Sequence, residues 1–261
     1  MKALAIIPAR YQSTRFHGKP LAMLGDKPML RHVYENVTNS GLFEKVVIAS
    51  DDERILEAAR SWNAEAIFTA NHHPSGTDRC AEAAEKIDGN FDIIVNIQGD
   101  EPFISREPLE ILLQIFENEP NAGIATLVHK INDPSEIDDS NTAKVVLGTQ
   151  SQVTNHKSQI HKALYFSRSP IPFIRSVEKS DWINYHIFWK HIGLYAFKPQ
   201  ILGEVVKLPV GLLEKAESLE QLRWLENGYH IYVAETKYKM LSVDTPADLE
   251  KAEKFLKKNN D

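Results

Sequence analysis

The sequence has very little cysteine and no long apolar run. Cys80 is the only cysteine among 261 residues, so an intrachain disulfide is impossible and a reducing, cytoplasmic setting is expected. No apolar stretch approaches the roughly 18 residues of a membrane-spanning helix. Pro8 and Arg10 interrupt the apolar start too early for a signal peptide. We therefore expect no membrane partner.

An excess of positive charge is also missing. The chain carries 30 Lys and Arg residues against 36 Asp and Glu residues, which gives a formal net charge of -6. Nucleic-acid-binding domains present a basic face, so no nucleic-acid partner is expected. The hydrophobic share of 43% and the charged share of 25% are typical of globular domains. The length allows one domain with a sizeable core.

Two common phosphate-binding fingerprints are absent, the Gly-x4-Gly-Lys-Ser/Thr loop and the Gly-x-Gly-x-x-Gly turn. A cationic loop is present instead: "ARYQSTRFHGKP" (9–20) follows the first apolar run and holds Arg10, Arg15 and Lys19 without any acid. Arg and Lys side chains with backbone N–H groups are suited to a polyphosphate, and Ser13 adds a hydroxyl. The alternative is a solvated basic loop without a ligand.

Strand and helix patterns alternate through the first half of the chain. The predicted strands cover 3–7, 45–50, 65–69 and 92–97, and the predicted helices cover 29–37, 53–60, 77–87 and 108–116. This alternation predicts a mostly parallel sheet with helices on both faces, which is an α/β fold. Cys80 falls inside a predicted helix, where a lone cysteine indicates packing.

The second half has strand patterns without long helices between them. They lie at 123–131, 143–148, 163–169 and 191–197, and a helix at 212–227, a strand at 230–236 and a helix at 246–258 follow. We predict antiparallel additions to the sheet or a small β subdomain, and a polar surface loop over 148–162. The chain is expected to form a single domain over 1–261. Its nucleotide-binding α/β part would cover about 1–125 and 200–261, and its β-rich part about 126–199.

Two acidic residues are candidates for a metal site. Asp100 follows the strand predicted at 92–97, and open α/β sheets bind ligands at the carboxyl ends of their strands. A carboxylate facing a cationic phosphate loop suits Mg²⁺, which takes oxygen ligands and binds phosphates. A cap of the next helix is the alternative for this segment. Asp244 lies in "SVDTPADLE", where the residues alone favour a helix cap over a metal ligand.

The stretch "HHPSGTDR" (72–79) contains two histidines and an aspartate. Their spacing does not fit a zinc site. Ser75, Gly76 and Thr77 open a predicted helix, and a helix start of this kind indicates a receptor for a polar or anionic group.

Seven stretches in this order carry a resemblance to a known family: "IIPARYQSTRFHGKPL", "HHPSGTDR", "NIQGDEP", "ALYFSRSPIP", "KHIGLYAF", "LEQLRWLENG" and "VDTPADLE". From about residue 3 to 255 the chain resembles the cytidylyltransferases of 3-deoxy-manno-octulosonate (Kdo), the CMP-Kdo synthetases. The resemblance implies a Rossmann-like nucleotidyltransferase fold with a β-rich subdomain that forms a homodimer. It also implies transfer of CMP from CTP to the anomeric hydroxyl of Kdo, with release of pyrophosphate, a requirement for Mg²⁺ and a role in lipopolysaccharide biosynthesis.

The resemblance also assigns roles to individual residues. The implied catalytic residues are Arg10, Lys19 and Asp100, and the implied metal ligands are Asp100 and Asp244. The implied nucleotide-binding residues are Arg10, Ser13, Arg15, Lys19, Ser75, Arg79 and Gln98. The implied sugar-binding residues are Arg168, His191, Tyr195, Glu220 and Gln221. For His191, a satisfied structural histidine is the alternative.

The chain departs from the family pattern at His17, where relatives usually have proline, and at "KMLS" (239–242), where many have Gly-Thr-Gly. The same chemistry on 8-amino-Kdo or on a sialic-type sugar acid therefore stays open. A glycosyltransferase would want an Asp-x-Asp motif, and neither "DDE" nor "GDE" provides one. A non-catalytic nucleotide sensor would not need Lys19, Asp100 and Asp244 together. Pyrophosphate release distinguishes the transferase from these other classes.

Overall fold

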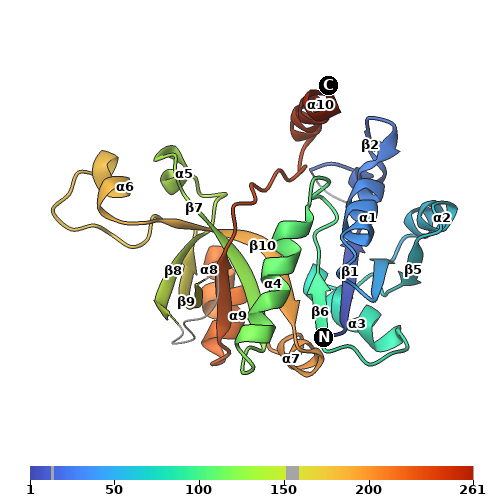
Figure 1. The fold of residues 1–261 in the computed structure, drawn as a ribbon, viewed down its shortest axis with the longest axis horizontal. Helices are drawn as coiled ribbons and strands as arrows, with labels where there is room; N and C mark the ends of the chain where they lie inside the picture. The colour runs from blue at the N-terminus through green and yellow to red at the C-terminus, as the bar shows by residue number, and fades with distance from the viewer. Residues whose placement is uncertain (13–14, 151–158, 261) are drawn as a thin grey trace. The chain divides into compact units, whose positions relative to one another are not determined.

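A computed structural model describes residues 1–12, 15–150 and 159–260 (Figure 1). The chain forms two compact units, and each is described by itself. Unit 1 consists of Met1–Leu109 and Lys239–Asp261, and unit 2 consists of Glu110–Tyr238. Unit 2 therefore includes residues 126–199, predicted as the β-rich part, and also residues 200–238, which the sequence placed with the nucleotide-binding part.

The strands of unit 1 are parallel, in the order β5-β4-β1-β6. They are β1 (Ala3–Ala9), β4 (Lys45–Ser50), β5 (Glu65–Phe68) and β6 (Ile93–Asn96), and the helices between them are α1 (Met29–Asn39), α2 (Glu53–Ser61) and α3 (Gly76–Lys86). The connection from β5 to β6 runs back across β4 and β1. Because such crossovers are right-handed, α1 and α2 cover one face of the sheet and α3 covers the other. The predicted α/β alternation is confirmed here.

Apolar runs and helix caps account for these elements. In β1 only Pro8 is not fully buried, so the strand reads as the continuous apolar run of a sheet covered on both faces. Helix α2 begins where the Asp52 side chain accepts a hydrogen bond from the Arg54 amide. Cys80 is fully buried in α3, so its predicted packing role is confirmed.

Unit 1 is completed by a small hairpin and the C-terminal helix. The hairpin strands are β2 (Met23–Leu24) and β3 (Lys27–Pro28), after the short 3-10 helix η1 (Lys19–Leu21), and α10 covers Pro246–Asn260. Leu24, Met29, Val243 and Ala252 form one buried cluster. Pro246 stands at the first position of α10, as predicted. This cluster fixes the segment just before α10, and Asp244 lies in that segment.

The strands of unit 2 lie in the order β10-β7-β11-β9-β8. They are β7 (Ile124–Lys130), β8 (Lys144–Gln150), β9 (Ile160–Ser167), β10 (Trp189–Phe197) and β11 (Ile231–Glu235). Only the β11–β7 pair is parallel among the pairs with a described register. The predicted antiparallel character is therefore confirmed for this unit. Helix α4 (Arg106–Asn118) begins in unit 1 and ends in unit 2.

One prediction about unit 2 is wrong, and another is wrong at its ends. The helix predicted over 212–227 is two helices, α8 (Leu212–Glu217) and α9 (Gln221–Glu226). Ser218 has a positive φ of 51°, and this left-handed conformation ends α8. The loop predicted over 148–162 is strand at both ends, because β8 runs to Gln150 and β9 begins at Ile160. Residues 151–158 lie outside the described residues.

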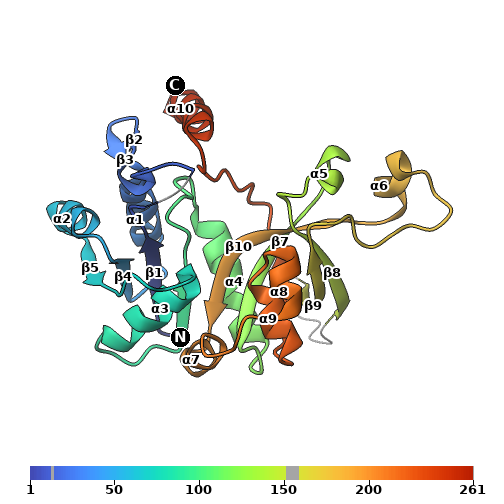
Figure 2. The same ribbon diagram turned by 180° about the vertical axis from the view of Figure 1, so that it is seen from behind.

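The short elements of unit 2 were not predicted. They are α5 (Ser135–Asp138), the 3-10 helix η2 (Lys179–Asp181), α6 (Trp182–Tyr185) and α7 (Pro199–Val205). In both views α6 lies on an arm, formed by residues 168–188 between β9 and β10, that extends away from β8 and β9 (Figures 1 and 2). Trp182 and Phe188 anchor this arm to Ile131 and Ile137 in a buried cluster. Within the described ranges, no helix is both long enough and apolar enough to cross a membrane.

Candidate functional site

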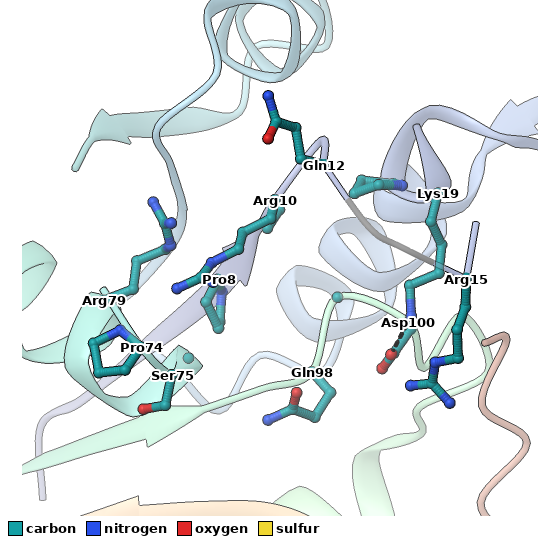
Figure 3. A pocket seen from close by; sticks show the side chains of 14 residues that line it. Pro8, Arg10, Gln12, Arg15, Lys19, Pro74, Ser75, Arg79, Gln98 and Asp100 are labelled. Atoms are coloured by element: carbon teal, nitrogen blue, oxygen red, sulfur yellow. Dashed lines mark hydrogen bonds and ion pairs between the residues drawn. The ribbon is translucent and has the colours of Figure 1, made fainter. Parts of the chain in front are cut away.

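Unit 1 has a pocket of about 420 Å³ at the carboxyl ends of β1 and β6. Figure 3 shows two groups of side chains with Gln98 between them: Arg10 and Arg79 near Ser75, and Arg15 and Lys19 near Asp100. The pocket is lined by Pro8, Ala9, Arg10, Gln12, Arg15, Lys19, Pro20, Pro74, Ser75, Gly76, Arg79, Gln98, Gly99 and Asp100. All predicted nucleotide-binding residues except Ser13 are therefore brought together, and Ser13 lies outside the described residues.

The cationic loop folds back on itself before it reaches Lys19. The Gly18 amide donates to the Tyr11 carbonyl over 2.9 Å, and Gly18 has a φ of +70°, which favours glycine. His17, one of the departures from the family pattern, packs edge-on against Tyr11 with ring centroids 5.0 Å apart. Arg54 covers the same ring, with its guanidinium carbon 3.5 Å from the centroid.

Lys19 contacts both predicted metal ligands. Its Nζ lies 2.6 Å from Asp100 Oδ2 and 3.1 Å from Asp244 Oδ1. Burial alone would lower the pKa of Lys19, but the charges and hydrogen bonds of Asp100 and Asp244 outweigh it and leave the pKa above its ordinary value. Lys19 is therefore a positive charge held at the point where two carboxylates meet.

The backbone brings these two carboxylates together although they are distant in the sequence. The Val243 amide donates to the Asp100 carbonyl over 3.0 Å, which sets Asp244 beside Asp100. Arg15 Nη2 also reaches Asp244 Oδ1, at 3.1 Å. The "KMLS" departure directly precedes this point, and its Met240 side chain is exposed.

The donor set of Asp100 and Asp244 fits a magnesium ion. Carboxylate oxygens are the ligands that Mg²⁺ prefers, and it is commonly bound by one or two carboxylates together with substrate phosphates. Among the residues that the structure describes, no group of three or more His, Cys, Asp or Glu side chains could hold a metal ion. Two carboxylates from the protein, with the remaining ligands from phosphate and water, are therefore the arrangement that these residues can provide.

Arg79 is fully buried beside the pocket. Its Nη2 lies 3.0 Å from Asp51 Oδ1, and its Nη1 donates to the Thr69 hydroxyl. Burial lowers the pKa of Arg79, the Asp51 carboxylate opposes this, and the charge of Arg10 adds to the lowering. Arg10 Nη2 is itself buried and has no hydrogen-bond partner in the described part of the chain. Two arginines held so close together favour a bound anion.

Ser75 and Gln98 lie on the wall of the pocket. Ser75 caps α3, since its side chain accepts hydrogen bonds from the amides of Thr77 and Asp78. Gly99, next to Gln98, approaches β1 so closely that a Cβ would lie 3.2 Å from the Pro8 carbonyl oxygen. The lack of a side chain at Gly99 therefore lets the loop after β6 pack against the end of β1 and present Gln98 and Asp100.

The predicted sugar-binding residues lie in unit 2. His191 and Tyr195 are neighbours on β10, with ring centroids 5.1 Å apart. Tyr195 packs edge-on against Trp224 of α9, the helix that begins at Gln221. Burial and the nearby Glu220 charge raise the pKa of Tyr195 well above its ordinary value, and burial lowers the pKa of His191 to about 3. The structure therefore groups Tyr195 with neutral His191 and with the start of α9.

Two polar atoms of this group lack a protein partner. Within the described residues, the Tyr195 hydroxyl and Gln221 Nε2 are buried and form no hydrogen bond. A buried polar atom without a partner is costly, and such atoms are rare in native proteins. A ligand with hydroxyl groups would supply the missing hydrogen bonds.

Arg168 is engaged by the backbone in this structure. Its Nε donates to the Glu217 carbonyl over 2.6 Å, its Nη1 to the Ser140 carbonyl over 2.9 Å and its Nη2 to the Ser218 carbonyl over 3.2 Å. Arg168 thereby holds the turn between α8 and α9 at Ser218, which lies three residues before Gln221. A guanidinium has five N–H groups, so two of them are left for a ligand. The carboxylate-binding role of Arg168 stays a prediction.

Sequence reasoning did not select three residues that contact the predicted ones: Asp51 and Thr69, which contact Arg79, and Thr126, which contacts His191. Asp51 had a usable signal, because it follows the strand predicted at 45–50 and so stands at the same sheet edge as Asp100. Thr69 and Thr126 had none, since a single threonine in a strand pattern indicates only β structure.

The model of the cytidylyltransferase family matches residues 4–241 of the chain. The chain is 49% identical over 260 residues to the 3-deoxy-manno-octulosonate cytidylyltransferase of Phocaeicola vulgatus, covering 98% of both chains. It is 44% identical over 262 residues to the protein of the same name in Thermodesulfovibrio yellowstonii, again covering 98% of both. These matches extend over nearly the whole length of each protein.

Solved structures agree with the sequence comparison. A CMP:2-keto-3-deoxy-manno-octonic acid synthetase in complex with CTP superimposes with a TM-score of 0.88 at 39% identity, covering 99% of this chain and all of that chain. A 4-diphosphocytidyl-2C-methyl-D-erythritol synthase from Anaerococcus prevotii, at 12% identity and a TM-score of 0.58, shares the fold. With the family model and the curated relatives, this likeness shows that the chain belongs to the cytidylyltransferase family, among the 3-deoxy-manno-octulosonate cytidylyltransferases.

Proposed function

We propose that the chain transfers CMP from CTP to the anomeric hydroxyl of Kdo, giving CMP-Kdo and pyrophosphate for lipopolysaccharide biosynthesis. The observation that supports this most directly is the contact of Lys19 with both Asp100 and Asp244 in a pocket that also contains Arg10 and Arg15. Transfer of a nucleotidyl group needs cations around the phosphates and carboxylates for a metal ion, and this pocket supplies both kinds of group.

In the proposed reaction the anomeric hydroxyl of Kdo loses its proton to water, and its oxygen forms a bond to the α-phosphorus of CTP. The bond between that phosphorus and the bridging oxygen to the β-phosphate breaks, and the oxygen leaves with pyrophosphate. The residues proposed as catalytic are Arg10, Lys19 and Asp100. Arg10, Arg15 and Lys19 would bind the phosphate oxygens and stabilise the charge of the leaving pyrophosphate. The rate gain would come from alignment and charge stabilisation, with no covalent intermediate on the protein.

Asp100 and Asp244 are the proposed ligands of Mg²⁺, because their oxygens lie within 3.1 Å of one nitrogen, Lys19 Nζ. When bound, the ion would neutralise phosphate charge. The nucleotide would be recognised by Ser75, Arg79 and Gln98 on the opposite side of the pocket, with Ser13 as a further proposed contact.

The sugar acid would be bound by residues of unit 2. Tyr195 and Gln221 present buried polar atoms without a protein partner in the described ranges, and His191 lies against Tyr195. Glu220 would accept a hydrogen bond from a hydroxyl, and Arg168 would use its remaining N–H groups for the carboxylate.

We also propose a cytoplasmic homodimer that forms through unit 2. The exposed large apolar side chains of this unit include Leu164, Phe173, Tyr185 and Ile187. Three of them lie on the arm that carries α6, and exposed apolar side chains close together are typical of interaction surfaces. Light scattering coupled to gel filtration would measure the mass of the chain and of Phe173→Asp. A monomeric mass for the unaltered chain would contradict the proposal.

The function is tested by pyrophosphate release with CTP and Mg²⁺, using Kdo, its 8-amino analogue and N-acetylneuraminate in parallel. Release with Kdo is expected. A preference for the amino sugar would assign the substrate to the alternative and make the "KMLS" segment the first place to examine for specificity. Silence with all three sugar acids would overturn the transferase proposal in favour of a nucleotide sensor.

Asp100→Asn and Asp244→Asn test the metal ligands. Each variant should need far more Mg²⁺ for half-maximal turnover, because it loses an anionic oxygen ligand. The matched control is Asp88→Asn, at an exposed aspartate of the same unit. An unchanged Mg²⁺ requirement in both site variants would contradict the proposed ligand set.

A further inference from the structure

The hydroxyl of Thr126 lies in unit 2 where β10 departs from regular pairing with β7. The register of the two strands shifts between Ile192 and Tyr195, as in a β-bulge, which leaves strand groups without their ladder partners. Thr126 is fully buried there. Its Oγ1 lies 3.1 Å from the Ile192 carbonyl oxygen, 2.8 Å from the Leu194 carbonyl oxygen and 3.0 Å from His191 Nε2.

The number of protons decides which of these groups donates. A threonine hydroxyl has one proton, and the carbonyls of Ile192 and Leu194 can only accept. If His191 Nε2 carried a lone pair, three acceptors would face that single proton, and two of them would receive none from the hydroxyl although they lie within 3.1 Å of it. If Nε2 carries a proton, it donates to the hydroxyl oxygen, and the hydroxyl donates to the nearer carbonyl, that of Leu194. The second arrangement uses both available protons and leaves only the Ile192 carbonyl without a proton from the hydroxyl.

We propose that Thr126 is a positioning residue that holds neutral His191 as the Nε2–H tautomer, so that Nδ1 is a hydrogen-bond acceptor for the substrate. A protein group that fixes one ring nitrogen determines what the other can do. In the part of the chain that the structure describes, Nδ1 of His191 has no hydrogen-bond partner. The lowered pKa of His191 keeps the ring neutral at neutral pH.

The surroundings of the ring indicate what Nδ1 accepts. Phe166 packs edge-on against His191 with ring centroids 5.4 Å apart, and the Tyr195 ring is tilted against it at 5.1 Å. Tyr195 and Gln221 contribute N–H or O–H groups, whereas Nδ1 is an acceptor only. This combination suits a polyhydroxylated sugar acid, with one sugar hydroxyl donating to Nδ1, and this step rests on the proposed function.

The tautomer is tested by nitrogen NMR on the full-length chain labelled at the histidine ring nitrogens. Protonated and unprotonated ring nitrogens of a neutral histidine give well-separated signals, and His191→Gln identifies the signals of His191 by their loss. His129 of the same unit is an internal reference with the opposite tautomer, because its Nδ1 lies 2.9 Å from the Thr236 carbonyl oxygen and must donate. A His191 signal with the proton on Nδ1 would overturn the proposal.

Two variants of Thr126 test its role. Thr126→Val keeps the shape and removes the hydroxyl, so His191 should become a mixture of tautomers; Thr126→Ser keeps the hydroxyl and should restore the Nε2–H form. In turnover assays the valine variant should raise the KM for the sugar acid by about fivefold to tenfold, with the KM for CTP unchanged. The serine variant should return toward the unaltered KM.

The two readouts fail separately. If the unaltered chain turned over no sugar acid, the proposed function would fail while the tautomer result still stood. A valine variant with the Nε2–H tautomer intact would overturn the positioning role of Thr126. A changed tautomer beside an unchanged KM for the sugar acid would overturn the link between Nδ1 and the substrate.

Discussion

The polar groups of the two units are prepared for ligands in different ways. In unit 1 the pocket contains charged groups that meet opposite charges: Lys19 contacts two carboxylates, and Arg79 contacts Asp51. In unit 2 the side chains of Tyr195 and Gln221 are neutral and buried, and each presents an atom without a partner in the described residues. Charged pairs that can exchange partners suit phosphates and a metal ion, whereas buried neutral groups suit hydroxyls.

The largest expected effect is on the charged side of this comparison. Lys19→Ala removes the cation that contacts Asp100 and Asp244, and kcat/KM should fall by about 100-fold to 1,000-fold, as on loss of a single group that stabilises transition-state charge. Steady-state pyrophosphate release measures it. Lys2→Ala is the control, since its ion pair with Glu44 is exposed and should be nearly neutral in effect. Equal activity of both variants would contradict the role of Lys19.

The second effect concerns the support of the unit 1 pocket. Glu82 accepts hydrogen bonds from Lys86 at 2.6 Å and from the Ala70 amide at 2.9 Å. It also contacts His73, which directly precedes the pocket residue Pro74. Burial opposes ionisation of Glu82, but these partners outweigh it and lower its pKa to about 2.

Because the folded-state pKa of Glu82 lies below the ordinary value, the stabilisation is present above about pH 4.5 and is lost as the pH falls toward 2. Glu82→Gln should therefore lower the free energy of unfolding by roughly 3 kcal/mol at pH 7 and by much less at pH 3. Urea unfolding at both pH values measures this. Glu85→Gln, at an exposed position of the same helix, should show no such pH dependence, and a pH-independent loss in Glu82→Gln would rule out the linkage.

The third effect is a pH dependence of the free energy of unfolding that arises in unit 2. Burial lowers the pKa of His191 to about 3, so the unfolded chain binds a proton below pH 6.5 that the folded chain does not. The free energy of unfolding should therefore fall as the pH drops from 6.5 toward 3. Between pH 7.5 and pH 5, His191→Asn should lose about 1–2 kcal/mol less than the unaltered chain. His230→Asn, at an exposed imidazole of the same unit, is the control, and equal losses in all three chains would contradict the assignment.

The sequence was sufficient for most elements of unit 1, because apolar periodicity and helix caps report directly on burial. It predicted the parallel strands and placed Asp100 at the carboxyl end of β6. It did not predict that Lys19 would contact both Asp100 and Asp244, since that contact depends on the Val243 amide reaching the Asp100 carbonyl. A long-range backbone hydrogen bond has no signature in a local pattern.

Unit 2 was less predictable for a similar reason. The apolar spacing from 212 to 227 fits one helix, and a single left-handed residue, Ser218, divides it. That division sets the turn that Arg168 holds, and α9 starts just after it. The bulge of β10 at Thr126 is likewise invisible to alternation, because it changes which residues are paired without changing their types. The sequence resemblance therefore named His191 and Tyr195, but nothing in the residues indicated which ring nitrogen of His191 is free.

The smallest expected effect is a change in the free energy of unfolding, and its sign distinguishes a ligand-binding hydroxyl from a structural one. The Tyr195 hydroxyl is buried without a hydrogen-bond partner among the described residues, whereas the Tyr229 hydroxyl of the same unit donates to Glu204 Oε2 over 3.0 Å. Tyr195→Phe removes an unsatisfied group, so the free energy of unfolding should stay the same or rise by up to about 1 kcal/mol. Tyr229→Phe removes a satisfied group and should lower it by about 0.5–1.5 kcal/mol.

Binding of the sugar acid should show the opposite pattern, with Tyr195→Phe impaired and Tyr229→Phe unaffected. Tyr195→Phe should raise the KM for the sugar acid by about fivefold to tenfold and leave the KM for CTP unchanged, because the hydroxyl is proposed to bind only the sugar. Tyr229→Phe should leave both KM values unchanged. Urea unfolding and steady-state kinetics on the same two preparations measure all of these quantities. A Tyr195→Phe variant that loses stability while binding the sugar acid normally would mean that the hydroxyl has a structural partner, and the contrast drawn between Tyr195 and Tyr229 would then fail.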